Sequence, residues 1–159
     1  MTFRRFEDID AWKTARQLAK AIYRMSASGS FRRDYGLRDQ VRRAVISMMA
    51  NIAEGHSRRS DREFAHFLFT AKGSAAEVES HLYIALDQGY LTEQQFQEAF
   101  AESERYARQV SGLIKYLTDG DGSQPASASR PKEIRLTSLG FVDSPADRVD
   151  RVDRVDRVD

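Results

Sequence analysis

Glu63 and His66 form a Glu-x-x-His motif, the pattern in this sequence with the clearest capacity for chemistry. On a helix the motif brings both side chains to one face, where ferritin-like bundles use it to bind a pair of metal ions. Such a site needs a second Glu-x-x-His and two more inward glutamates, and the sequence has no second copy of the motif. Glu77 and His81 would bind a metal only weakly without facing ligands. We predict no metal site and no cofactor, and a metal-binding bundle built on Glu63 and His66 is kept as an alternative.

The sequence offers no catalytic centre of a familiar kind. No short stretch supplies a nucleophile together with a base and an orienting acid. Cysteine is absent, which excludes disulfides, thiolate chemistry and cysteine-based zinc sites. The polar residues Ser47, Asn51 and Glu54 are predicted to be structural, satisfying helix-end backbone groups and side chains of a facing helix. Gly55 suits a left-handed position at the end of a helix. We therefore predict that the protein is not an enzyme.

Charge is distributed unevenly along the chain, although the formal net charge is only +1. Residues 32–62 contain eight arginines and four acidic residues, a net charge of +4, whereas residues 74–104 contain seven acidic residues and no Lys or Arg, a net charge of −7. This segregation is typical of an electropositive face that binds a phosphate backbone. It is equally typical of two complementary faces through which subunits associate head to tail.

Apolar residues recur with a helical period in four segments. This pattern predicts four helices, which would position the polar residues described in the preceding paragraphs. The first helix is predicted from Asp8, as its N-cap, to residue 28, and the second spans residues 35–54. Capping boxes at Ser60 with Glu63 and at Thr92 with Gln95 announce a third helix that ends near residue 89 and a fourth that ends near residue 117. Because the connections are short, successive helices should be antiparallel neighbours. The predicted fold is an all-α, antiparallel up-down four-helix bundle with a flexible C-terminal tail.

The composition divides the chain into residues 1–118, the predicted bundle domain, and residues 119–159, a predicted linker and low-complexity tail that is largely disordered. The linker is rich in Gly, Ser and Pro, and the chain ends in an Arg-Val-Asp repeat. Between them lies a brief apolar patch able to dock on a neighbour, formed by Ile134, Leu136, Leu139, Phe141 and Val142. No segment approaches the roughly 20 apolar residues that span a bilayer, and the N-terminus lacks a signal-peptide core. We expect a cytoplasmic protein without a membrane partner.

With these segments in view, the sequence resembles the four helix bundle protein family encoded in intervening sequences of bacterial 23S ribosomal RNA genes. The resemblance covers residues 6–117, and its most specific part is the block Asn51-Ile52-Ala53-Glu54-Gly55. Further matching residues are Phe6-Glu7-Asp8, Trp12, Tyr35-Gly36-Leu37, Arg42-Arg43-Ala44, Arg59-Ser60, Gly73-Ser74 and Gly89-Tyr90-Leu91.

The resemblance implies a cytoplasmic homopentamer of antiparallel four-helix bundles with no known catalytic activity. The family is also similar in fold to accessory proteins of diversity-generating retroelements, which are basic pentamers that bind nucleic acid and a reverse transcriptase. By that analogy the residues expected to contact phosphate are Arg42, Arg43, Arg58, Arg59 and Arg62. We therefore expect a non-enzymatic, oligomeric scaffold associated with RNA or DNA. The main alternative is a protein–protein adaptor whose arginines serve subunit contacts.

Overall fold

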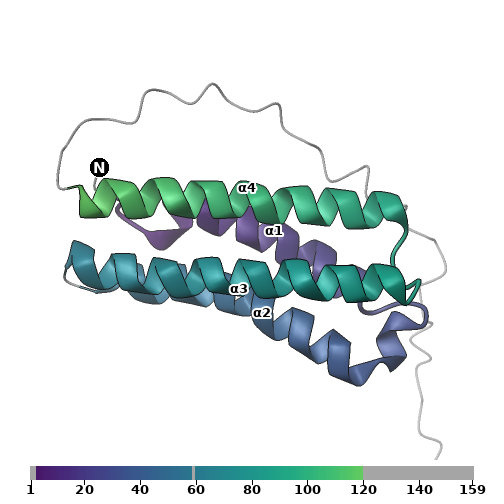
Figure 1. Ribbon diagram of the computed structural model, residues 1–159. Coiled ribbons are helices and arrows are strands. Elements are labelled where there is room, and N and C mark those ends of the chain that lie inside the picture. The colour runs from purple at the N-terminus through teal and green to yellow at the C-terminus, as the bar shows by residue number, and fades with distance from the viewer. Residues whose placement is uncertain (1–2, 59, 120–159) are drawn as a thin grey trace, which may run out of the picture.

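Four helices make up most of the computed structural model, which describes residues 3–58 and 60–119 (Figure 1). They are α1 (Asp10–Met25), α2 (Tyr35–His56), α3 (Asp61–Asp87) and α4 (Glu93–Thr118). Two short 3-10 helices, η1 (Phe6–Asp8) and η2 (Phe31–Arg33), precede α1 and α2. These residues contain no strand, so the predicted all-helical fold is confirmed. The predicted tail lies outside the described residues except for its first residue.

Local side-chain caps begin the last two helices where the sequence predicts them. Thr92 and Gln95 form a complete capping box at the start of α4, each accepting a hydrogen bond from the other's backbone N–H. At the start of α3, the Ser60 hydroxyl accepts from the Glu63 N–H over 3.2 Å, but the Glu63 carboxylate accepts from that hydroxyl rather than from the backbone. The capping box predicted at Ser60 and Glu63 is therefore only half formed.

The start of α1 differs from the prediction. Ile9, not Asp8, occupies the N-cap position, and no side chain caps the helix. Residues 6–8 instead coil into η1, whose Phe6 ring meets Trp12 edge-on with centroids 5.1 Å apart. Asp8 thus belongs to the preceding turn, because the aromatic contact fixes how the chain enters the helix.

The core fills the space between the helices. The helix α2 packs against α1 and α3, and α4 packs against α1 and α3. Side chains with almost no exposed surface come from all four helices, among them Leu18, Ile22, Met48, Ile52, Leu68, Leu82, Tyr106 and Val110. Burying each such aliphatic side chain contributes roughly 1.5–3 kcal/mol. No described helix has an apolar stretch long enough to cross a membrane.

Tyr106 crosses the core from α4 to α2. Its ring is fully buried, and its hydroxyl donates a hydrogen bond of 2.9 Å to the carbonyl oxygen of Met48. Burial raises the pKa of the Tyr106 hydroxyl, because the charged phenolate cannot be solvated there. This side chain fixes the position of α4 relative to the middle of α2.

Gly55 lets α2 and α3 touch where they are joined. A Cβ atom built there would lie 2.6 Å from Phe64 Cδ2 and 2.8 Å from Phe67 Cβ. Gly55 lies inside α2, which continues to His56, and among the described residues only Gly29 and Gly89 have a positive φ. The predicted left-handed conformation of Gly55 is therefore wrong. Close packing against the next helix, rather than backbone conformation, calls for glycine here.

Candidate nucleic-acid interface

The arginines expected to contact phosphate lie in two separate places. Arg42 and Arg43 are in the first half of α2, whereas Arg58 follows the end of α2 and Arg62 lies in the first turn of α3. Arg58 lies fifteen positions after Arg43, which corresponds to roughly 20 Å along a helix. Arg59 lies outside the described residues. The expected residues therefore do not form one compact patch within a single copy of the chain.

Arg42 points toward α1. Its Nε donates a hydrogen bond of 2.7 Å to the Ser26 hydroxyl, and its Nη2 donates one of 3.4 Å to the Tyr23 carbonyl oxygen. The guanidinium also lies over the Tyr23 ring, 4.7 Å from the centroid. A cation at the C-terminal end of α1 is favourable because the helix dipole is negative there. Arg42 thus joins α2 to α1, although its partners are uncharged and leave its positive charge in place.

Arg43, the next residue, is exposed, and within the described ranges no hydrogen bond or ion pair engages its guanidinium. The same holds for Arg32 and Arg33 in η2. Arg38 differs, because it forms an ion pair of 2.9 Å with Asp39. Sequence reasoning omitted Arg32 and Arg33 from the expected contacts, although they lie directly before α2 and are exposed.

Arg58 is largely occupied within its own subunit. It forms an ion pair with Glu54 one turn earlier, and its guanidinium lies over the Phe67 ring, 4.9 Å from the centroid. Glu54, predicted to be structural, thereby reduces the positive charge at this corner. Arg62 is exposed and has no ion pair among the described residues.

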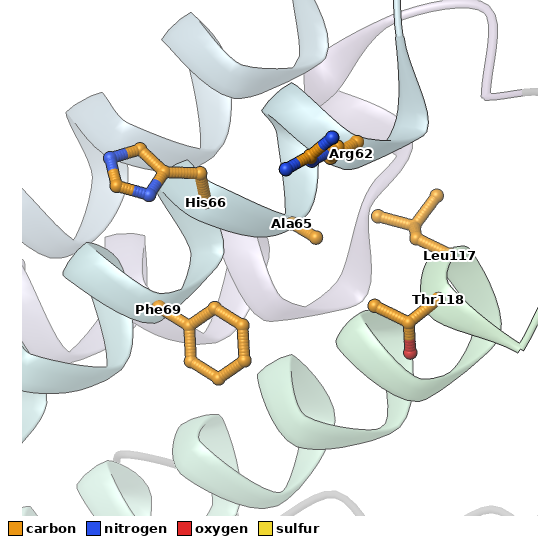
Figure 2. A pocket seen from close by; sticks show the side chains of 6 residues that line it. All are labelled: Arg62, Ala65, His66, Phe69, Leu117 and Thr118. Carbon is orange, nitrogen blue, oxygen red and sulfur yellow. The ribbon is translucent and has the colours of Figure 1, made fainter.

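Arg62 borders an open pocket of about 430 Å³ between the start of α3 and the end of α4. Figure 2 shows Arg62, His66 and Phe69 of α3 on one side and Leu117 and Thr118 of α4 on the other. Phe69 lines the pocket with 59% of its side chain exposed. The pocket combines an apolar wall with a cationic edge.

Ser47 and Asn51 belong to a polar connection between α2 and α3. The Asn51 amide donates to the Ser47 carbonyl oxygen over 2.8 Å and to the Ser47 hydroxyl over 3.0 Å. From α3, the hydroxyl of the buried Ser74 donates to the same Ser47 hydroxyl over 2.8 Å. Sequence reasoning did not single out Ser74 as a partner, since its small size suggested only close backbone packing.

Glu63 and His66 have no third potential metal ligand close to them among the described residues. Glu63 is engaged by Ser60, and the His66 ring lies edge-on to Phe67 with centroids 6.2 Å apart. In the part of the chain that the structure describes, no three His, Cys, Asp or Glu side chains gather closely enough to hold a metal ion. No observation therefore favours the metal-binding alternative.

Four packed helices with arginines exposed on two parts of the surface define the chain as an all-helical bundle protein. A family model described as 23S rRNA-intervening sequence protein matches residues 7–112, and the chain belongs to that family. The predicted family is thus confirmed. The chain is also similar to a solved structure from Bacteroides thetaiotaomicron, a protein of unknown function from the S23 ribosomal protein family.

The similarity to that structure concerns the fold alone, because the sequences are only 22% identical. The TM-score is 0.60, and the match covers 66% of this chain and 98% of the other. No curated protein matches this sequence.

Proposed function

We propose that this protein is a non-enzymatic, cytoplasmic scaffold in which copies of the bundle join through oppositely charged faces into a homopentamer that binds RNA or DNA. One observation carries the proposal: a net charge of +4 over residues 32–62, mainly α2, against −7 over residues 74–104, the end of α3 and the start of α4. Two segments of opposite charge, residues 32–62 and residues 74–104, favour association between copies in a fixed orientation. We call the surfaces they form the positive and the negative flank.

An antiparallel up-down order of the helices is part of this proposal. Two contacts support it: Ser47 meets Ser74, and Gly55, later in α2, packs against Phe64, earlier in α3. With this order, Arg43 and Glu77 are each about one turn from the Ser47–Ser74 contact, toward the same end of the bundle. The basic half of α2 then lies beside the acidic half of α3, so that one end of each copy has a positive and a negative flank.

Such flanks suit a head-to-tail contact, in which one copy's positive side faces the next copy's negative side. A contact of this kind generates a ring when the rotation between copies closes. A ring repeats every exposed arginine around its circumference, which would join the two arginine groups of single copies into a larger basic surface. Arg32, Arg33, Arg43 and Arg62 are exposed, and among the described residues no ion pair occupies their guanidinium groups, which suits them to phosphate. A reverse transcriptase is a further proposed partner, by analogy of fold.

The non-enzymatic part of the proposal is supported by how the interior polar groups are used. The Tyr106 hydroxyl binds the Met48 carbonyl oxygen, and the buried Ser103 hydroxyl donates to the Ala75 carbonyl oxygen over 3.4 Å. The Tyr106 and Ser103 hydroxyls connect α4 to α2 and α3, Asn51 bonds within α2, and none of the three lines the pocket beside Arg62.

An adaptor that binds only protein is the second candidate, and the occupied arginines favour it. Arg42 is engaged by α1 and Arg58 by Glu54, so two of the four described candidate arginines have structural partners. Binding of the full chain to a generic single-stranded RNA at increasing salt separates the candidates. Phosphate contacts give a log–log slope of about −0.7 per neutralised phosphate, because counterions are released. Absence of binding, or a slope near zero, would leave only the adaptor.

A further inference from the structure

The pocket beside Arg62 lies where the chain leaves the bundle. Leu117 and Thr118, which form one wall, are the last two residues of α4, and Asp119 caps that helix. The chain continues for 40 residues beyond Asp119. The pocket is therefore the part of the bundle surface nearest to the start of this remaining segment.

The pocket has the chemistry of a site for an apolar peptide. Ala65 is buried in its floor, while Phe69 leaves 59% of its surface exposed beside Leu117. An exposed aromatic ring beside a hollow offers apolar area against which another chain segment can pack. Arg62 and His66 at the edge add donors suited to a carboxylate.

We propose that residues 134–142 dock into this pocket of the same chain, with Leu139 and Phe141 packing against Phe69 and Leu117. Between Asp119 and the repeat, this segment holds all the large apolar side chains, and Asp143 directly after it complements Arg62. Ile134 lies fifteen positions after Asp119, a stretch that reaches at most about 50 Å, so the linker easily spans the distance to an adjacent pocket. A short tether also gives the segment an effective concentration in the millimolar range.

Docking there would place an apolar segment, followed by the Asp143 carboxylate, over Arg62. If the proposed function holds, the segment competes with nucleic acid for Arg62. Nucleic acid and residues 134–142 then cannot bind at this arginine at the same time. The docking itself does not depend on nucleic-acid binding.

The absence of cysteine makes a direct distance measurement possible. Spin labels at Lys72→Cys and Ser138→Cys in the full chain should give one short, narrow distance distribution. Leu139→Asp, which leaves the bundle untouched, and Phe69→Ala should both make the distribution long and broad. Tyr83→Ala is the matched control, because Tyr83 is a similarly exposed aromatic of α3 (51%) that does not line the pocket. A broad distribution that neither variant alters would overturn the proposal.

A mixture of two singly labelled chains tests whether the segment docks on another copy instead. A short distance between labels on different copies would also overturn docking within one chain.

Added RNA should lengthen the intramolecular distance between the two labels. If the docked state is about ten times as populated as the free state, Leu139→Asp should raise RNA affinity roughly tenfold. RNA that binds without moving the labels would refute competition. A chain that docks its segment but binds no RNA would refute the proposed function alone.

Discussion

The Ser74 hydroxyl on α3 donates a hydrogen bond of 2.8 Å to the Ser47 hydroxyl on α2. Asn51 donates to the same oxygen from one turn further along α2, so a single hydroxyl connects side chains of both helices. Ser74 is only 5% exposed, and its hydroxyl also lies 3.2 Å from the Thr70 carbonyl oxygen of its own helix, so this buried group is fully supplied with protein partners. The connection lies next to the block of residues 51–55 that carries the family resemblance.

Replacing Ser74 by Ala should lower the free energy of unfolding by about 0.5–1.5 kcal/mol, because the variant lacks the buried hydrogen bond to Ser47 while Ser47 keeps its bond from Asn51. Urea unfolding measures the change. Ser80→Ala, at an exposed position of the same helix, is the control and should leave stability unchanged. Equal effects at the two positions would show that the Ser47–Ser74 bond contributes nothing specific.

Gly55→Ala should destabilise the protein by about 1–3 kcal/mol, since the new methyl group would overlap Phe64 and the Cβ of Phe67. Gly112→Ala is the matched control: it also lies in a helix, and a Cβ there meets nothing within 4 Å. This control should raise stability by roughly 0.5–1 kcal/mol through the higher helix propensity of alanine. Thermal unfolding of both variants compares them, and tolerance of Ala at Gly55 would contradict the close packing of α2 and α3.

Substitution by Ala should lower stability at Arg42 and RNA affinity at its neighbour Arg43. Arg42→Ala should cost about 1–2 kcal/mol of stability, because it removes a charge-assisted hydrogen bond to Ser26 and the interaction with the Tyr23 ring. Arg43→Ala should change stability by less than about 0.5 kcal/mol. It should instead weaken RNA binding and reduce the salt slope for single-stranded RNA by about 0.7 for each phosphate that the variant no longer neutralises. Unfolding and RNA titration of both variants test this division of roles, and an exchange of the two effects would refute it.

Tyr106→Phe should lower stability at neutral pH by about 0.5–1.5 kcal/mol, the net contribution of the hydrogen bond to the Met48 carbonyl oxygen. The effect should change at alkaline pH. Burial raises the pKa of Tyr106 in the folded state, so its protonated form stabilises the fold below about pH 10, and this contribution is lost as the unfolded chain ionises above that pH. The stability advantage of the wild type over the variant should therefore shrink above pH 10 and then reverse, because only the wild type loses stability there. A gap that stays constant in unfolding measurements across this range would contradict a buried, protonated Tyr106.

The sequence was sufficient to predict the helices, because their apolar periodicity and caps are local signals. The complete capping box at Thr92 and Gln95 is an example, since both partners lie within one turn. The start of α1 was mispredicted because the contact between Phe6 and Trp12 overrides the capping preference of Asp8.

The site was harder to predict, because the partners of its arginines are distant in sequence. Arg42 binds Ser26, sixteen residues earlier, and no local pattern distinguishes it from the exposed Arg43. For Gly55, the contact with Phe64 depends on how the chain turns between α2 and α3. Composition indicates where charge gathers, but only packing decides which charges remain available.

The native mass of the full chain tests most directly whether oppositely charged flanks join the bundles. At low ionic strength we predict a mass of about five times the 18.1 kDa chain, with smaller species appearing as salt screens the flanks. A single 18.1 kDa species at every salt concentration would contradict the account.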